Sequence, residues 1–386
     1  MNVSASYSPV IVAAKRSAIG IAGHGFADVT APNLAAPVLK AVAAEISPLD
    51  TPIDDVILGN CLGPGGDVAR VSALLAGLGV GVPGVTVDRQ CGSGLDAVAQ
   101  AASRIRSGDE TSILAGGVES ASTSPWRFWP PVDGEEPVRY TRAPFAPPGF
   151  EDPDMGVAAD DLARIRGIGR ERQDAYAARS FARAAACDFS AEIVTVSDVA
   201  TDERIRPNMT AQRLGRLRPT FTPAGTFTPA GTVTAGNSCG ISDGAAVLAI
   251  TTAERAAGMP ALRILGSAVA GSDPALPGLG PVPAIEKLLA RTGVGLSDIE
   301  TIEITEITEA FASVVLAVSD ELGLDEDRIC PQGGAIAMGH PWGASGAILL
   351  VRLASRMLQP GGPALGLAAC AIGGGQGIAM LVERAT

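Results

Sequence analysis

Short apolar runs alternate along this chain with alanine-rich stretches of helical spacing, and glycine or proline residues separate one from the next. The runs with strand character are Pro9–Ala14, Asp55–Leu58, Thr111–Ala115, Ala245–Thr251, Ala261–Ser267 and Gly377–Val382. Helical spacing is clearest in Leu34–Glu45 and Ala284–Arg291. Because this alternation is typical of helices packed on buried, largely parallel strands, it predicts an α/β fold of layered sheets and helices.

A weak internal repeat supports two similar halves. The motif Ser93-Gly94, followed by Ala102-Ser103-Arg104, recurs 252 positions later as Ser345-Gly346 followed by Ala354-Ser355-Arg356. Each motif opens a helical stretch after a glycine-rich turn, and each stretch leads into a strand of small residues. A true duplication would bring the two glycine-rich turns together near a pseudo-twofold axis, whereas chance in an alanine-rich chain is the alternative.

The composition limits the class of protein. Of 386 residues, 47% are hydrophobic and 18% are charged, which allows a large core and excludes a disordered chain. The 29 basic and 41 acidic residues give a net charge of −12, which argues against nucleic acid or an anionic membrane as the main partner. With no recognisable signal sequence and no apolar run of about 20 residues, we expect a cytoplasmic protein.

The middle of the chain differs in composition from its flanks. Two tryptophans and two proline pairs precede a charged helical stretch from Ala158 to Ala186. We therefore expect four segments: 1–120 as the first part of an N-terminal half, 121–236 as an inserted loop or lid domain, 237–260 as the return to that half, and 261–386 as a C-terminal half.

Histidine and cysteine are the residues that most restrict the chemistry. The only histidines are His24 and His340, and no two of the six cysteines lie closer than 30 positions. Zinc-type spacing is therefore absent, and disulfides are unexpected in a chain of this kind, so we predict no metal site.

Cys91, in "DRQCGSGLDAV", lies just before a stretch of helical spacing. A helix N-terminus favours a thiolate, and its free N–H groups can hold the oxyanion of an acyl-transfer intermediate. The alternative is a small buried cysteine that packs a helix start. His340, in "GGAIAMGHPWGASGA", stands among glycines before a second helix, which is unlike a histidine packed in the core and fits an imidazole presented at a tight turn. A Cys91–His340 pair is a familiar source of a reactive thiol.

Cys370 precedes a second glycine-rich turn, in "GLAACAIGGGQGIAM". It could act as a general acid or base, or it could be a buried cysteine at a strand end. The three consecutive glycines after it lack the spacing of a dinucleotide-binding fingerprint.

These three motifs, in this order, resemble the thiolase family. The likeness runs almost end to end and includes "VILGNCLGPG", "AGGVESAS", "DMGVAADDLA" and "TVTAGNSCGISDGAAVLAI". The resemblance implies two βαβαβαββ halves stacked in five layers, an inserted loop domain, and a homodimer or homotetramer. It implies no permanently bound cofactor, with acetyl-CoA and other coenzyme A thioesters as substrates.

The resemblance also assigns roles to residues. It makes Cys91 the acyl-accepting nucleophile, His340 its base, and the Cys91 and Gly373 N–H groups one oxyanion hole. Met155 would lie at the substrate, and Arg218 would contact coenzyme A phosphates unless it belongs to a merely solvated basic turn.

Two departures from the family pattern bear on the chemistry. The resemblance also implies a second oxyanion hole, formed by His340 and a water held by the asparagine of the family's N-E-A-F motif. Thr308 stands in place of that asparagine, so this water is lost or repositioned. The cysteine of the family's Cys-x-Gly-Gly-x-x-Gly pattern falls at Ala371 rather than Cys370. Either a bulge brings Cys370 to the site, or the second catalytic cysteine is absent.

A third departure concerns the substrate. Asp154 precedes Met155 where short-chain biosynthetic members have histidine, which leaves the acyl-chain preference open.

Three functions follow from these residues. The preferred one is a thiolase-type acyltransferase that forms or cleaves a carbon–carbon bond between thioesters through a Cys91 acyl-enzyme. The first alternative is a thiolase-like acyltransferase of specialised metabolism that uses Cys91 and His340 without the second cysteine. The second is a catalytically silent thiolase fold that serves as a binding subunit.

Overall fold

The backbone of the fold is a large sheet made of two sets of strands. The computed structural model describes residues 7–222, 230–294 and 304–385. The first set comprises β1 (Pro9–Ser17), β3 (Asp55–Gly59), β4 (Val85–Val87), β5 (Ser112–Glu119) and β9 (Ser242–Thr252). The second comprises β10 (Ala261–Gly271), β11 (Ile304–Ile307), β12 (Leu365–Ile372) and β13 (Gln376–Ala385). The order β11-β12-β13-β10-β1-β9-β5-β3-β4 joins both sets through a short antiparallel contact between β1 and β10.

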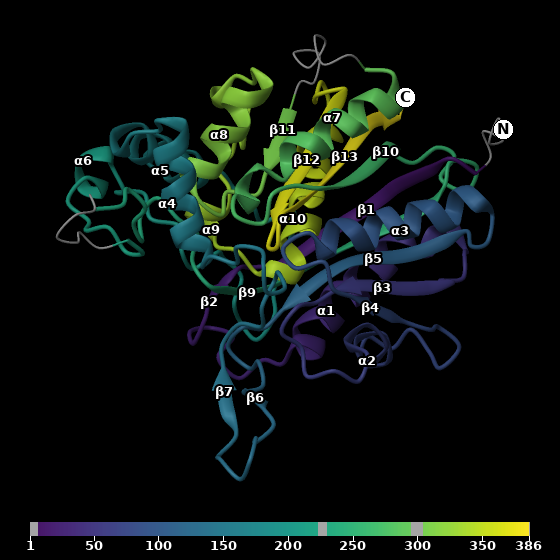
Figure 1. The fold of residues 1–386 in the computed structure, drawn as a ribbon. Helices are drawn as coiled ribbons and strands as arrows, with labels where there is room; N and C mark the ends of the chain where they lie inside the picture. The colour runs from purple at the N-terminus through teal and green to yellow at the C-terminus, as the bar shows by residue number, and fades with distance from the viewer. Residues whose placement is uncertain (1–6, 223–229, 295–303, 386) are drawn as a thin grey trace.

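Helices fill the space between the two sets of strands and cover their outer faces, which gives five layers (Figure 1). Helices α1 (Ala31–Ile46) and α2 (Val68–Leu75) cover the first set, and α7 (Pro281–Thr292) covers the second. Helices α3 (Ser93–Ser107) and α10 (Trp342–Met357) form the middle layer and contact strands of both sets. The predicted layered α/β architecture is confirmed.

The two middle helices cross at a pair of glycines. A Cβ atom on Gly94 would lie 2.9 Å from the Ala347 backbone N, and one on Gly346 would lie 2.6 Å from the Leu95 backbone N. These are the glycines of the repeated Ser-Gly motif. Their missing side chains let the first turns of both helices meet, so the loops that precede the helices end up side by side.

The predicted strands form where the apolar runs indicated, and the structure extends most of them by a few residues. The charged helical stretch from Ala158 to Ala186 forms two helices instead of one, α4 (Met155–Arg166) and α5 (Arg170–Ala185). Gly167 causes the break because it ends α4 with φ 65°, a left-handed conformation that glycine adopts at little cost.

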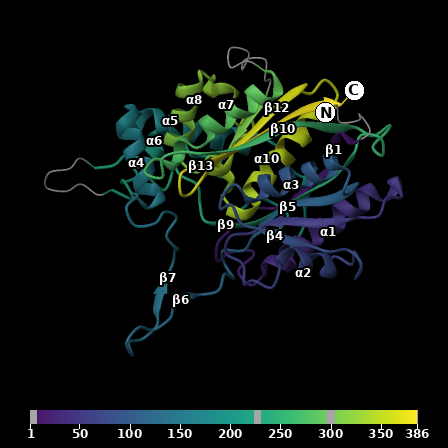
Figure 2. The same ribbon diagram turned by 45° about the vertical axis from the view of Figure 1, so that its right-hand side comes forward.

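Most of the middle of the chain lies outside the large sheet and forms two separate groups of elements. The two strands β6 (Arg127–Trp129) and β7 (Val138–Tyr140) form a hairpin that extends away from the other elements in both views (Figures 1 and 2). Helices α4, α5 and the short α6 (Ala211–Leu214) instead pack beside α8 (Ala312–Leu322) and α9 (Ala335–Met338). Short strands β2 (Gly20–Ile21) and β8 (Ile193–Val194) pair with β9 and β1. Within the described ranges, no helix is long and apolar enough to cross a membrane.

A buried ion network joins segment 121–236 to β1 and α10 of the layered part of the fold. Arg16 of β1 contacts Glu192 and Asp202, each at 2.7 Å, and Arg352 of α10 contacts Glu192 at 2.6 Å. All four side chains are almost completely buried. Because each buried charge has a partner, the cost of removing it from water is offset, and the network fixes where the chain re-enters the core.

Candidate active site

A cavity of about 400 Å³ lies where the loops before α3 and α10 meet, and Cys91 and His340 both line it. Met155 and Gly373, which the sequence analysis also singled out, lie on the same wall. The remaining lining is mostly apolar and includes Phe221, Phe311, Trp342 and Ala371. The structure therefore brings four of the predicted site residues together from segments far apart in the sequence.

Cys91 sits in a strained loop between β4 and α3. The preceding residue, Gln90, has φ 49°, which a residue other than glycine rarely adopts. Its carbonyl oxygen accepts hydrogen bonds from the Ser93 hydroxyl at 2.6 Å, the Ser93 N–H at 3.0 Å and the Cys61 thiol at 3.2 Å. These three donors stabilise the strained conformation, which presents Cys91 to the cavity.

The Cys91 thiol is protonated at neutral pH. Burial raises its pKa well above the usual range, and the neighbouring Cys370 and Cys239 raise it further. The sequence analysis expected the helix N-terminus to favour the thiolate. Removal from water outweighs that dipole effect here, so a Cys91 thiol that attacked a carbonyl would have to lose its proton to a base.

His340 is arranged to be that base. Its Nδ1 lies 2.6 Å from the Ser345 hydroxyl, which is itself 3.0 Å from the Pro341 carbonyl oxygen. Because the hydroxyl donates its one hydrogen to that carbonyl, it accepts from Nδ1–H, which leaves a lone pair on Nε2. Nε2 is buried without a hydrogen-bond partner, and burial lowers the His340 pKa to about 4. His340 is thus a neutral proton acceptor.

Glu119, at the end of β5, holds the loops around the cavity in place. Its carboxylate accepts from the backbone N–H groups of Cys61, Leu62 and Gly343 at 3.0–3.1 Å, and from the Asn60 amide at 3.0 Å. Burial raises its pKa. The sequence analysis did not single this residue out, although a carboxylate at the end of a wholly apolar strand was a signal that it has buried partners.

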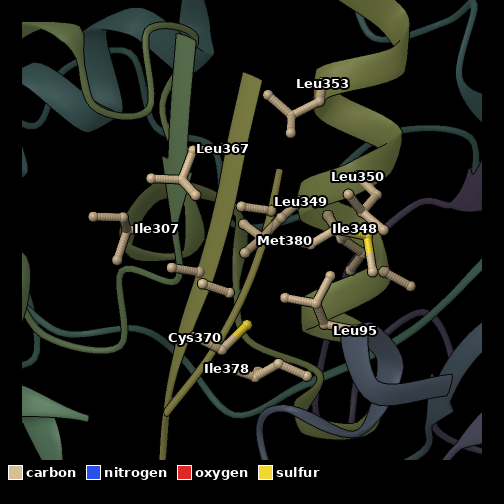
Figure 3. Packing of buried hydrophobic residues seen from close by; sticks show 14 of the residues in the cluster. Leu95, Ile307, Ile348, Leu349, Leu350, Leu353, Leu367, Cys370, Ile378 and Met380 are labelled. Carbon is tan, nitrogen blue, oxygen red and sulfur yellow. The ribbon is translucent and has the colours of Figure 1, made fainter. Parts of the chain in front are cut away.

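Cys370 and Ala371 lie on opposite faces of β12. The pairing of β12 with β13 runs from Leu365 to Ile372 with no bulge, so the side chains alternate without interruption. Ala371 lines the cavity, and Cys370 is not among its lining residues. Figure 3 shows Cys370 directed into the packed layer near Leu95 and Ile348, where it is fully buried. The bulge that would have turned Cys370 to the site is absent from this ladder.

Thr308 bonds to Cys370. The Thr308 hydroxyl donates to the Cys370 sulfur at 3.2 Å, and burial raises the pKa of the Cys370 thiol to about 12. Thr308 also lines a separate small cavity of about 20 Å³, together with Ser345 and Glu306. It is not among the residues that line the cavity of Cys91 and His340.

Two other candidates lie away from the cavity. Arg218 is exposed, and the lining does not include it. His24, the competing histidine, is exposed in the loop after β2. Among the residues that the structure describes, no group of three histidine, cysteine or acidic side chains is placed to hold a metal ion.

Cys239 is a second thiol on the wall of this cavity, and the sequence analysis included it only as part of a longer motif. It lines the same cavity as Cys91 and His340, on the segment that enters β9. Its backbone N–H donates to the Ala310 carbonyl at 2.9 Å, and the next carbonyl, that of Gly240, accepts from the His340 N–H at 3.1 Å. The available signal was a cysteine next to glycine just before a buried strand.

A thiol beside a neutral imidazole in an apolar cavity can carry out acyl transfer. The imidazole removes the thiol proton as sulfur attacks a carbonyl, and exclusion of water protects the resulting acyl-sulfur bond. Cys91, just before α3, and Gly373, in the glycine turn after β12, both line the cavity, so their backbone N–H groups are candidates to hold an oxyanion.

Comparison with known proteins agrees with this geometry. Residues 9–254 match the thiolase N-terminal domain, and residues 259–384 match the thiolase C-terminal domain. The chain is 44% identical to the acetyl-CoA acetyltransferase of Escherichia coli (strain K12), and the alignment covers 97% of this chain and 98% of that protein. It is 41% identical to the putative acetyl-CoA C-acetyltransferase YhfS of Bacillus subtilis (strain 168), with the same shares covered.

A solved structure is similar over the whole fold. The crystal structure of the Bacillus anthracis acetyl-CoA acetyltransferase matches with a TM-score of 0.89 and 35% sequence identity, and covers 98% of this chain and 99% of that chain. From its sequence, its five layers and its cavity, this chain belongs to the thiolase family.

Proposed function

We propose that this protein is a thiolase-type acyltransferase (acetyl-CoA C-acyltransferase) that moves acyl groups between coenzyme A thioesters through an acyl-enzyme on Cys91. The observation that carries the proposal is the shared cavity of Cys91 and His340, in which the imidazole Nε2 is buried without a partner. A buried acceptor beside a protonated thiol is what nucleophilic attack on a thioester requires.

Each residue of the site has a role in this proposal. His340 takes the Cys91 proton, and Ser345 fixes the tautomer that leaves Nε2 free. The N–H groups of Cys91 and Gly373 stabilise the oxyanion, and Met155 packs against the acyl group. Thr308 holds the Cys370 side chain in place by donating a hydrogen bond to its sulfur. Met155 and Phe221 of segment 121–236, which we propose as the loop domain, line the cavity, and exposed Arg218 of the same segment meets the coenzyme A phosphates in this proposal.

One alternative has an observation in its favour. Ala371 on the cavity wall cannot give or take a proton, and this agrees with a thiolase-like enzyme of specialised metabolism that uses only Cys91 and His340. Such an enzyme would acylate Cys91 without cleaving acetoacetyl-CoA. A catalytically silent binding subunit is the weaker candidate because it would not need the unpartnered imidazole.

Intact-mass measurement tests the acyl-enzyme directly. After the protein is mixed with acetyl-CoA, we expect one acetyl group per chain, and we expect none on the Cys91→Ala variant. His340→Ala should slow the acylation by about 100-fold or more, because general-base help is typically worth that much. An adduct that survives in Cys91→Ala would overturn the assignment of the nucleophile.

We further propose a homodimer or homotetramer in the cytoplasm. The β6–β7 hairpin exposes several large apolar side chains, among them Trp126, Phe128 and Val138, which is unusual for a surface that faces only water. All six cysteines are unpaired, which agrees with a reducing compartment.

A further inference from the structure

The reaction proposed above needs a second proton-transfer group that the predicted candidates do not supply on the cavity wall. When the carbon–carbon bond of a 3-ketoacyl thioester breaks, the departing α-carbon must receive a proton. Ala371 has no proton to give, and Cys370 points into the packed layer behind the wall. His340 has already taken the Cys91 proton in this scheme.

Cys239 lies on the cavity wall, where this second proton-transfer group is needed. Of the six cysteines, only it and Cys91 line the large cavity. Its segment is fixed on both sides: Cys239 N–H donates to Ala310, and the adjoining Gly240 carbonyl accepts from His340 N–H. The thiol is therefore attached to the same short stretch of backbone that positions the base.

Two other polar side chains that line the cavity are unsuitable as proton donors, because one already donates a hydrogen bond and the other is exposed to water. The Ser238 hydroxyl donates to the Thr234 carbonyl at 2.7 Å. Asp154 lies at the exposed end of the cavity, where its carboxylate is 80% exposed and 3.6 Å from the Arg142 guanidinium. Neither offers a proton inside the cavity as Cys239 does.

We infer that Cys239 is the proton donor and acceptor of the carbon–carbon step, in place of the cysteine that this chain lacks at position 371. The inference rests on the acyl-enzyme function proposed above. In the cleavage direction, the Cys91 sulfur bonds to the β-carbonyl carbon while His340 takes its proton. The bond between the α- and β-carbons then breaks, and the electron pair left on the α-carbon takes the Cys239 thiol proton.

The second half of the reaction restores both groups. Coenzyme A gives its thiol proton to the Cys239 thiolate, and its sulfur attacks the acyl-Cys91 carbonyl. Cys91 leaves and recovers its proton from His340. Protons and electrons therefore balance over one turnover with no additional reactant, and condensation is the same sequence in reverse.

The surroundings of Cys239 suit both protonation states. Burial raises the pKa of its thiol to about 12, so it holds a proton at neutral pH. Arg204 opposes that rise, and its guanidinium is held nearby by bonds to the Ser238 and Ala235 carbonyls, both at 3.0 Å. A fixed positive charge next to the sulfur stabilises the thiolate while it exists.

The test separates the two half-reactions in Cys239→Ser, Cys239→Ala and Cys370→Ala, with Cys187→Ser as a matched control outside the cavity. Acylation is followed by intact mass after addition of acetyl-CoA. The carbon–carbon step is followed by thiolysis of acetoacetyl-CoA and by uptake of solvent deuterium at the α-carbon of acetyl-CoA.

We expect Cys239→Ala to acylate within about threefold of the wild-type rate but to lose about 100-fold or more in thiolysis and deuterium uptake. Cys370→Ala and Cys187→Ser should keep both steps. The inference is overturned if Cys239→Ala retains thiolysis, if Cys370→Ala loses it instead, or if the wild type acylates but neither cleaves nor exchanges. Failure of the wild type to acylate would instead remove the proposed function. Serine is close to cysteine in size, and acylation of the Cys239→Ser variant shows whether it folds. If this variant acylates but loses thiolysis, a packing defect is excluded as the cause.

Discussion

The reactive residues of this protein are uncharged when they meet. Burial keeps Cys91 as a thiol and His340 as a neutral imidazole, so the pair is not a preformed thiolate and imidazolium. Because the His340 pKa is about 4, its base form persists throughout the range above that pH. Burial thus sets the protonation state from which the proposed reaction would start, and it would also keep water from the proposed acyl-enzyme.

Glu306, also buried, gives a prediction for stability. Burial raises its pKa from 4.5 to about 7, and its Oε1 has no hydrogen-bond partner. The folded protein therefore holds this proton more tightly than the unfolded chain does, and the resulting stability is present below about pH 4.5 and lost as pH rises through 7. We expect Glu306→Gln to recover on the order of 3 kcal/mol at pH 8 relative to pH 4.5.

Urea unfolding at several pH values measures this effect. The control is Glu135→Gln, which changes an exposed carboxyl group in the turn between β6 and β7. A Glu306→Gln stability curve that runs parallel to the wild-type curve from pH 4.5 to 8 would show that the proton on Glu306 does not matter.

Among the elements, the crossing of α3 and α10 is what assembles the site. Each helix begins directly after one of the reactive loops, and each has a glycine where the other helix approaches most closely. The repeated Ser-Gly motif predicted that two glycine-rich turns would meet. It could not predict that the contact would be backbone against backbone, since that depends on the angle at which two helices from different halves pack.

We predict that Gly346→Ala destabilises the fold by about 1–3 kcal/mol, the usual cost of overpacking a close contact. The added Cβ would lie 2.6 Å from the Leu95 backbone N and 2.7 Å from the Leu95 Cβ. This outweighs the gain in helix propensity, which is smaller than about 1 kcal/mol. Chemical denaturation with intact-mass acylation measures both consequences, and the acylation rate should fall too.

Gly81→Ala is the control for that substitution. An added Cβ at Gly81 meets no atom within 4 Å, and its φ is not positive. If both variants unfold at the same denaturant concentration as the wild type, the helix crossing tolerates a methyl group and its role has been overstated.

In the molecule as a whole, segment 121–236 contributes both to the wall of the cavity and to the outer surface. Its helices form one wall of the cavity through Met155, whereas the β6–β7 hairpin extends away from the layers (Figure 2). Large apolar side chains beside and on the hairpin remain exposed: Trp126 is 71% exposed although the Arg139 guanidinium stacks on its ring, and Val138 is 60% exposed. A second copy of the chain would bury them.

We therefore predict that replacing Phe128 and Val138 together by serine weakens the largest assembly by roughly 100-fold or more, since each buried apolar side chain contributes about 1.5–3 kcal/mol. Size-exclusion chromatography with light scattering over a dilution series measures this. Ile165→Ser, at an isolated exposed apolar residue of α4, is the control. An unchanged dissociation profile in the double variant would remove the hairpin from the interface.

How much of the structure the sequence could predict depended on how far apart in the chain the interacting residues lie. Strand and helix positions follow from local hydrophobic periodicity, so most strands and the layered α/β class were predicted from it, whereas the five layers were implied only by the resemblance to the thiolase family. Cys91 and His340 stood out because glycines surround both and because the chain has only two histidines. Glu119 and Cys239 were not singled out, because their importance lies in partners 57 residues or more away: Glu119 accepts from the Leu62 N–H, and the Cys239 N–H donates to the Ala310 carbonyl.

By itself the sequence determined the family, the layered fold and which thiol and imidazole are candidates to react, since motif order and periodicity are properties of the chain. Only the tertiary structure decided the protonation of Cys91, the free nitrogen of His340, and which face of β12 meets the cavity. Desolvation, hydrogen-bond partners and strand register are set by packing between distant segments. For that reason the cysteine one position from the family's pattern lies behind the wall, and a different cysteine faces the nucleophile's cavity.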